Sequence, residues 1–249
     1  MQEIAGRLIP APAEGLVTIQ EGFRWDECDA YLFDIDGTLL HAQGGVHTGA
    51  FSSSVQTVLG HPLPIDSVPV HGSTDTGILR DAFRLAAIPD EVWQPRLEEI
   101  LEIMRQSVLE QRKRMSVTVM PGVLSMLAYL KSRGKILGVA TGNLEQIGWL
   151  KIEIAGLRDW FSFGGFSDRH ALRSDMIAHA VAAGGFAGTQ ATVCVVGDTP
   201  SDIAAAKAND LPTIAVATGV YSYQTLLHHQ PEVTTSTLEA LLATVAQPW

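Results

Sequence analysis

The segment YLFDIDGT at residues 31–38 places a short apolar run directly before two aspartates. A run of this length that ends in small or acidic residues is typical of a buried parallel strand. Further apolar runs of the same kind follow along the chain. They are ILGVA (136–140), VCVV (193–196), TIAVA (213–217) and the weaker FSFGGF (161–166).

Segments with helical periodicity separate these runs, at residues 122–132, 144–154, 174–183 and 201–208. Strands that alternate with helices are joined by right-handed crossovers, so the sequence predicts an α/β fold with a doubly wound parallel sheet.

Residues 47–115 break this alternation, because they contain three helical patterns, beginning near Thr48, Thr74 and Pro89, and no convincing strand. The last pattern carries an apolar stripe with charged flanks, which predicts a buried helix face. Glycines and prolines bracket the region, as at points where a chain leaves and re-enters a domain. We therefore predict an N-terminal extension (1–24), a core (25–45 and 117–249) and a helical insert (46–116). The stripe consists of Leu97, Ile100, Leu101, Met104, Val108 and Leu109.

Composition narrows the function classes. The 249 residues carry 17 Lys and Arg against 27 Asp and Glu, a formal net charge of −10, which disfavours a broad nucleic-acid-binding face. No apolar stretch approaches about 18 residues, and no signal peptide is evident, so we expect no membrane span. Two distant cysteines, Cys28 and Cys194, predict no disulfide framework and favour the reducing cytoplasm. Histidine spacing disfavours zinc.

Polar residues follow three of the predicted strands. Open parallel sheets bind ligands at the carboxyl ends of their strands, so these residues are expected to meet at one edge. Asp34 and Asp36 are two residues apart, which in extended chain puts both side chains on one face, and Asp198 is expected to join them. Close carboxylates repel one another unless a cation is present, and an all-oxygen set suits Mg²⁺. The hydroxyls of Thr38 and Thr141 can donate to phosphoryl oxygens.

Four motifs together resemble those of the haloacid dehalogenase superfamily. They are DIDGT after a strand, TGN at the end of a strand, a basic residue, and GDTPSD after a later strand. Four motifs in order, each in its expected structural context, are specific evidence, and the match extends from about Tyr31 to Val220. The resemblance implies a Rossmann-like core with a helical cap inserted between the first and second motifs. Within the superfamily, the chain resembles phosphoglycolate-phosphatase-like members.

The resemblance implies a role for each residue that matches a family motif. Asp34 is similar to the nucleophile that forms an aspartyl-phosphate, and Asp36 to the general acid and base. The second motif implies phosphate binding by Thr141, Gly142 and Asn143. The fourth implies Mg²⁺ ligation by Asp198, with the main-chain carbonyl of Asp36 as a further ligand. Asp202 is expected at the same centre, orienting a metal-bound water or the basic residue. The predicted metal-site residues are thus Asp34, Asp36, Asp198 and Asp202.

The third motif departs from the common family pattern, since no Lys-Pro dipeptide occurs between residues 161 and 180. Arg173 is our candidate for the basic residue, because its guanidinium can neutralise both the phosphoryl charge and the nucleophile. Arg169 is the rival. A structural alternative for Arg173 is a surface salt bridge.

Three features of the insert bear on substrate contact. His47 lies where the core passes into the cap, either as a linker residue or as an aid to proton transfer, as in related sugar phosphomutases. The segment Gly72 to Asp75 indicates a turn and a helix cap, and it is also a candidate substrate loop. Arg80 and Arg84 are candidates for contacting a substrate carboxylate.

The leading hypothesis is a Mg²⁺-dependent phosphatase that hydrolyses a small phosphorylated metabolite. A sugar phosphomutase is the alternative within the same chemistry, and a non-catalytic binding protein is the alternative outside it. Dehalogenase and phosphonatase activities are less favoured, because those branches lack the second aspartate that Asp36 provides. A nucleophile and an acid together argue against a purely binding role.

Overall fold

The computed structural model describes residues 6–10 and 15–245, and within these ranges eight strands form one large sheet. The strands are β1 (Gly6–Pro10), β2 (Leu16–Gln20), β3 (Ala30–Phe33), β6 (Ile136–Ala140), β7 (Phe163–Gly165), β8 (Val193–Gly197), β9 (Thr213–Val216) and β10 (Val233–Thr235). Their order is β1-β2-β10-β9-β8-β3-β6-β7, and every pair from β10 to β7 is parallel. The α/β fold with a doubly wound parallel core is therefore confirmed.

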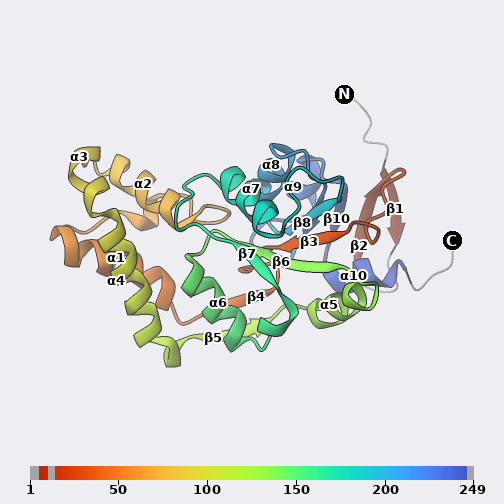
Figure 1. Ribbon diagram of the computed structural model, residues 1–249, viewed down its shortest axis with the longest axis horizontal. Coiled ribbons are helices and arrows are strands. Elements are labelled where there is room, and N and C mark those ends of the chain that lie inside the picture. Colours follow the sequence, from red (N-terminus) through yellow and green to blue (C-terminus); the bar gives the residue numbers. More distant parts are fainter. Residues whose placement is uncertain (1–5, 11–14, 246–249) are drawn as a thin grey trace.

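Helices cover both faces of this sheet (Figure 1). In the central strand β3, Tyr31 and Phe33 pack on one face with residues of α5, whereas Leu32 packs on the other with residues of α7. Because β3 is buried on both sides, its sequence is continuously apolar rather than alternating. The core helices are α5 (Val123–Ser132), α6 (Glu145–Ile154), α7 (Arg173–Ala183), α8 (Pro200–Lys207), α9 (Tyr223–His228) and α10 (Leu238–Ala243).

The predicted N-terminal extension (1–24) lies partly outside the described residues, at 1–5 and 11–14. We predicted no element within it, but β2 pairs antiparallel with β10 and buries Val17 and Ile19. A five-residue segment does not reveal a partner that is more than 200 residues away in the sequence, so this strand depends on tertiary pairing.

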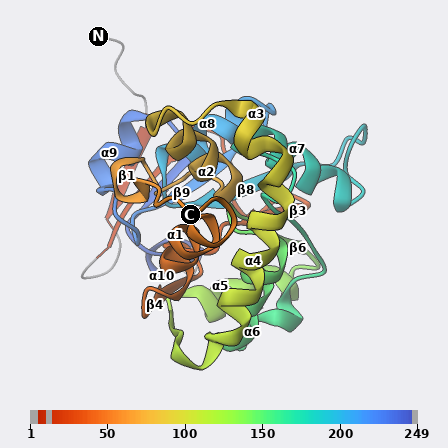
Figure 2. The same ribbon diagram turned by 90° about the vertical axis from the view of Figure 1, so that its left-hand side faces the viewer.

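The insert forms a separate helical layer at one end of the sheet, which Figure 2 views face on. The apolar stripe is buried as predicted at Ile100, Leu101, Met104 and Val108, and it packs against α1 in one apolar cluster. The helices of this cap are α1 (Val46–Leu59), α2 (Asp75–Leu85), α3 (Asp90–Trp93) and α4 (Leu97–Glu110), with short 3₁₀ turns at Ile65–Ser67, Gln94–Arg96 and Arg112–Arg114.

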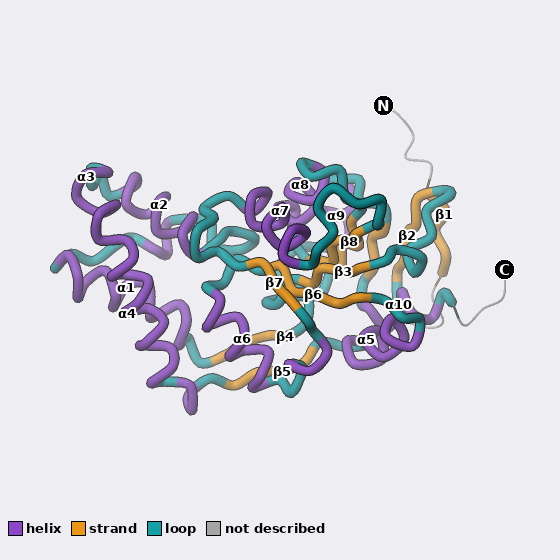
Figure 3. The backbone as a smooth tube through the Cα atoms, in the orientation of Figure 1, coloured by secondary structure: helices purple, strands orange, loops and turns teal. Residues whose placement is uncertain are grey.

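Two short strands connect the cap to the core. β4 (Leu40–Gln43) and β5 (Ser116–Val119) pair antiparallel, so the outgoing and returning chains run side by side (Figure 3). This pair was not predicted from the sequence. Its strands are four residues long, and the paired residues Gln43 and Ser116 are 73 positions apart in the sequence. Short strands with distant partners leave little local signal.

The cap is packed firmly against the core. Its apolar cluster includes Leu144, Ile147 and Leu150, which lie on or next to the core helix α6. Polar contacts add to this packing: Thr76 donates to the carbonyl oxygens of Ser167 and His170, both at 3.0 Å. Arg105 of α4 pairs with Asp168 of the core at 3.0 Å. The cap therefore covers the edge of the sheet at which the functional residues were predicted.

Two further predictions concern the whole chain. Cys28 and Cys194 are both buried, and both are free thiols. Among the described helices, none has the length and apolar character that a membrane crossing requires.

Candidate active site

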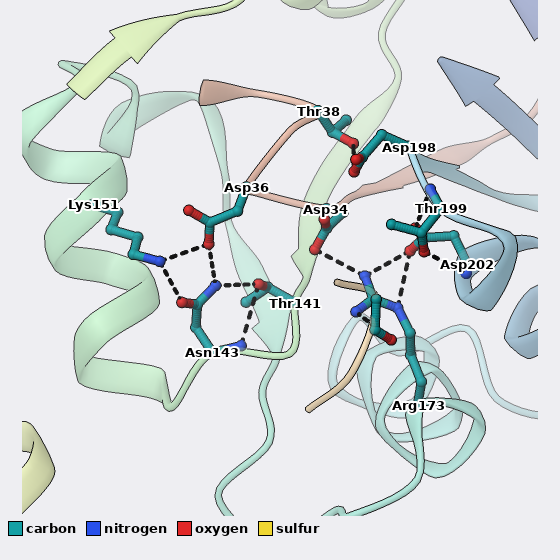
Figure 4. Close-up of polar contacts among 11 residues, drawn as sticks. Asp34, Asp36, Thr38, Thr141, Asn143, Lys151, Arg173, Asp198, Thr199 and Asp202 are labelled. Atoms are coloured by element: carbon teal, nitrogen blue, oxygen red, sulfur yellow. Dashed lines mark hydrogen bonds and ion pairs between the residues drawn. The ribbon is translucent and has the colours of Figure 1, made fainter. Parts of the chain in front are cut away.

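The carboxyl ends of β3, β6 and β8 meet beneath the cap and bring the predicted motifs together (Figure 4). Strand β3 is the first of the parallel series and lies between β6 and β8, which puts this edge at the topological switch point of the sheet. A cavity of about 560 Å³ lies here, and residues from both core and cap line it. Asp34, Asp36, Thr141, Arg173 and Asp198 are among them.

Three buried carboxylates form the acidic part of the site. Asp34, Asp198 and Asp202 each offer an oxygen within 4.8 Å of the others. Burial raises the pKa of Asp34 to about 7, with Arg173 opposing the effect and Asp202 and Asp36 adding to it. Burial and repulsion from Asp34 and Asp202 raise the pKa of Asp198 to about 8. A divalent cation would relieve this repulsion, and carboxylate oxygens are the donors that Mg²⁺ prefers, so the cluster fits such an ion.

Asp202 is the most constrained member of this cluster. One of its oxygens accepts from Arg173 Nε and Nη2 at 2.9 and 2.6 Å, and the other accepts from Thr199 N and Oγ1 at 3.0 and 2.7 Å. The second pair of contacts belongs to a capping box at the start of α8. Of the roles predicted for Asp202, its contacts match orientation of the basic residue.

The expectation that the Asp36 side chain joins Asp34 and Asp198 needs correction. Its carboxylate turns away from that cluster and accepts from Lys151 Nζ at 2.6 Å and Asn143 Nδ2 at 2.9 Å (Figure 4). Strand β3 ends at Phe33, so the same-face rule for extended chain does not reach Asp36. Desolvation in the cavity raises the pKa of Asp36, but attraction and hydrogen bonding from Lys151 outweigh it and hold that pKa below its ordinary value.

Arg173, at the start of α7, is the cation next to Asp34. Its Nη2 lies 2.9 Å from Asp34 Oδ1 and 2.6 Å from Asp202 Oδ1, and its side chain is 8% exposed. The surface salt bridge that we considered for Arg173 therefore does not describe it. Arg169 does not line the cavity.

The residues of the second motif, Thr141 to Asn143, make different contacts. Thr141 Oγ1 accepts from Asn143 Nδ2 at 2.6 Å and from Asn143 N at 3.3 Å, so the Thr141 hydroxyl keeps its own proton for donation. The Asn143 side chain, expected at the phosphate, instead joins Thr141, Asp36 and Lys151, and its amide hydrogens are used within the protein. Gly142 lines the cavity, and a Cβ there would collide with the Ser73 carbonyl of the cap.

Thr38 also differs from the expectation. It is fully buried, does not line the cavity, and donates its hydroxyl to Asp198 Oδ1 at 3.1 Å. Its role as a direct phosphate ligand is therefore corrected to orienting Asp198. Gly37 packs against the same carboxylate, and its φ of 90° together with this contact leaves no room for a side chain.

Lys151 is the residue that the sequence analysis missed. It lies on α6, is 3% exposed, and donates all three ammonium hydrogens: to Asp36 at 2.6 Å, Asn143 Oδ1 at 2.7 Å and His47 Nδ1 at 3.2 Å. Because His47 Nδ1 faces an ammonium donor, its Nε2 carries the proton and donates to Asp75 at 3.0 Å. A signal existed in the sequence, since Lys151 stands four residues after the buried Ile147, where the helical period calls for an apolar residue.

The cap candidates are also placed. Thr74 is the N-cap of α2 and accepts from Gly77 N at 3.0 Å, whereas Gly72, Ser73 and Asp75 line the cavity, so this segment is both a helix cap and part of the cavity wall. The candidate carboxylate contacts Arg80 and Arg84 do not line the cavity. Both pair with Asp81, at 3.0 and 3.9 Å.

A doubly wound sheet that gathers buried carboxylates and an arginine at one edge beneath a helical cap is typical of an α/β enzyme. The family model for haloacid dehalogenase-like hydrolases matches residues 28–210, which is most of the chain. The chain belongs to this family and is a hydrolase, so the resemblance inferred from the motifs is confirmed.

Relatives and solved structures agree with this assignment. The chain is 28% identical over 222 residues to "Probable phosphatase IndB" of Dickeya dadantii, covering 85% of this chain and 90% of the relative. It is 29% identical over 200 residues to a phosphoglycolate phosphatase of Rhodospirillum rubrum, covering 76% and 80% of the two chains. The crystal structure of a hydrolase from Pseudomonas syringae has the same fold, with a TM-score of 0.59, 17% identity and coverage of 87% and 97%.

Proposed function

We propose that this protein is a Mg²⁺-dependent phosphatase that hydrolyses a small-molecule phosphate monoester through an aspartyl-phosphate. One observation carries the proposal: the buried Asp34 carboxylate lies in a single cavity with the Arg173 guanidinium, the Asp198 carboxylate and the separately held Asp36 carboxylate. The names of the two relatives, a phosphatase and a phosphoglycolate phosphatase, support the same reaction.

Asp34 and Asp198 would hold the Mg²⁺ ion, with the main-chain carbonyl of Asp36 as a third protein ligand. When bound, the ion would neutralise charge on the phosphoryl group and on the carboxylates around it. Thr38 and Asp202 would act indirectly, by holding the side chains of Asp198 and Arg173. Thr38 fixes Asp198 by a hydrogen bond, and Asp202 anchors the arginine.

In the first half-reaction, an oxygen of Asp34 attacks phosphorus and the bond to the leaving oxygen breaks. Arg173 holds Asp34 Oδ1 at 2.9 Å, which leaves Oδ2 for the attack. The Thr141 hydroxyl donates to a phosphoryl oxygen. Asp36, whose pKa Lys151 holds below its ordinary value, takes up a proton from solvent at Oδ1 and passes it to the leaving alkoxide.

In the second half-reaction, Asp36 accepts a proton from a water molecule, whose oxygen attacks phosphorus and releases Asp34 and inorganic phosphate. The carboxylate form of Asp36 is needed for this step, and the Lys151 ammonium at 2.6 Å favours that form. Lys151 and Asn143 both hold Asp36 Oδ2, so Oδ1 is the oxygen left to exchange the proton.

Hydrolysis is preferred to phosphomutase chemistry. The histidine that suggested a mutase, His47, has Nδ1 in contact with Lys151 and Nε2 in contact with Asp75, so both ring nitrogens are engaged within the protein. A non-catalytic binding role does not require an acid and a nucleophile beside the same cavity.

The test is phosphate release by the purified protein from benzyl phosphate and a sugar phosphate, with Mg²⁺ and then with EDTA. We expect release with Mg²⁺ only, and none from the Asp34→Asn variant, whose fold is checked by circular dichroism. Formation of a positional isomer of the sugar phosphate would favour the mutase, and the absence of any metal-dependent turnover would favour the binding role.

A further inference from the structure

The cavity continues from the carboxylate cluster into the cap, and that part of its wall combines apolar side chains with polar ones at His47, Thr48, His71, Ser73 and Asp75. Phe51 stacks against His47 with ring centroids 5.3 Å apart, which gives this wall a flat aromatic surface. At about 560 Å³, the cavity is in the size range of pockets that enclose whole small-molecule ligands. The apolar residues that the cap contributes to the lining are Val46, Phe51, Ile65, Val70, Ile78 and Met115.

The lysine and arginine at this cavity are already engaged within the protein. Lys151 and Arg173 are the lysine and arginine side chains that line the cavity. The three ammonium hydrogens of Lys151 are used within the protein, and Arg173 is committed to Asp34 and Asp202. The rest of the wall adds the Asp75 carboxylate and the imidazoles of His41 and His71, so no lysine or arginine among the described lining residues is left for a substrate carboxylate.

We propose that the leaving group of the substrate is uncharged and largely apolar, with a ring or hydrocarbon portion larger than a two-carbon acid. This inference rests on the proposed function and names its substrate class. Burying a carboxylate without a partner in such a wall costs free energy, whereas an uncharged ring gains contact with Phe51 and its neighbours. Acidic phosphate esters such as phosphoglycolate are therefore poor substrates for this chain, although relatives carry the name phosphoglycolate phosphatase.

The experiment compares benzyl phosphate with 4-carboxybenzyl phosphate at pH 8. The two esters have similar leaving oxygens and differ in one distant charge, so intrinsic reactivity is matched. We expect kcat/KM to be at least about tenfold lower for the carboxylated ester, since a difference of roughly 1.4 kcal/mol is tenfold. Phosphoglycolate is expected to be a poorer substrate than benzyl phosphate. Equal or better turnover of the two acids would overturn the inference and leave the phosphatase assignment intact.

A cavity variant tests whether the missing cation causes the discrimination. Val70 lines the cavity and is 37% exposed, so a lysine can be introduced there without burying it. Val70→Lys is expected to recover most of the activity on 4-carboxybenzyl phosphate. Val70→Met, which adds length without charge, is expected to leave the preference as it is. An unchanged preference in both variants would count against the charge argument.

A binding measurement distinguishes failure of this inference from failure of the proposed function. Asp34→Asn protein with Mg²⁺ is titrated calorimetrically with each ester, which measures preference without turnover. One outcome is that no ester is hydrolysed but benzyl phosphate still binds at least about tenfold more tightly than 4-carboxybenzyl phosphate. The phosphatase proposal would then be wrong, and the inference that the cavity prefers an uncharged group would stand. Equal affinity for both esters would overturn the inference.

Discussion

Lys151 shows how a single buried cation organises the acid and base of this site. Its three donors meet three acceptors, on Asp36, Asn143 and His47, so the ammonium is fully satisfied although it is 3% exposed. Because those acceptors come from the core and from the cap, Lys151 ties the two parts together at the point where proton transfer is proposed.

Replacing Lys151 by methionine removes the group that orients Asp36. We expect kcat/KM for benzyl phosphate, which reports only the first half-reaction, to fall about a hundredfold, because general acid catalysis is typically worth that much or more. The loss on 4-nitrophenyl phosphate is expected to be much smaller, since 4-nitrophenolate leaves without a proton. Steady-state kinetics on both esters make the comparison, with Lys151→Arg as the variant that keeps the charge. Equal losses of kcat/KM on both esters would contradict an effect through Asp36 as the general acid.

Thr38 supplies a second prediction at the residue scale. Thr38→Val keeps the shape of the side chain but removes the donor to Asp198 Oδ1. We expect the Mg²⁺ concentration for half-maximal activity to rise about tenfold, the usual effect of losing a hydrogen bond to a metal ligand. Thr38→Ser, which keeps the hydroxyl, is the control. A Mg²⁺ titration that is unchanged in Thr38→Val would refute the role of Thr38 as an orienting residue.

At the scale of elements, the glycine at the start of α5 shows how helices are fitted together. Gly122 has a φ of 78°, and a Cβ at this position would collide with the backbone of Glu239 in α10. Gly134, just after α5, has a similar φ of 72°, but it faces open space. The two glycines therefore share a backbone conformation and differ in packing.

This pair predicts a measurable difference in stability. Gly134→Ala is expected to lower the free energy of unfolding by about 1–2 kcal/mol, the cost of the left-handed conformation alone. Gly122→Ala also forces α10 to move, so it is expected to lower the free energy of unfolding by about 3 kcal/mol or more. Urea denaturation of both variants checks the prediction. Equal losses would mean that α10 moves aside without cost.

Elements with strong internal periodicity could be predicted from the sequence, whereas paired short strands could not. The α4 stripe and the apolar run of β3 each carry their own signal over one segment. β2, β4 and β5 depend on partners far away along the chain, at β10 and on each other. Pairing across such distances is fixed by the assembled fold, not by local preference.

At the scale of the whole molecule, the fold concentrates negative charge that a metal ion would balance. The pKa of Asp34 rises to about 7 and that of Asp198 to about 8, above the ordinary value of 3.8. Between about pH 4 and pH 8 the folded protein thus holds more protons than the unfolded chain, so these two groups make stability fall as pH rises.

We therefore expect the metal-free protein in EDTA to unfold at a lower temperature at pH 8 than at pH 5. Added Mg²⁺ is expected to raise the unfolding temperature more at pH 8 than at pH 5, because protons compete with the ion at the lower pH. Differential scanning fluorimetry across this pH range measures both effects. In the Asp198→Asn variant, the unfolding temperature of the metal-free protein is expected to depend less on pH. A Mg²⁺ effect on the unfolding temperature that is the same at both pH values would argue against ion binding at this cluster.

By itself, the sequence determined the α/β class, the helical insert and the strand ends at which Asp34, Thr141 and Asp198 lie. It could do so because buried strands and amphipathic helices leave patterns over single segments, and parallel strands bring their carboxyl ends to one edge. Only the tertiary structure decided where Asp36 and Thr38 point, that Arg173 and not Arg169 contacts Asp34, and that Lys151 belongs to the site. Those facts depend on side chains from distant segments that satisfy one another in a buried space, and no local pattern encodes that.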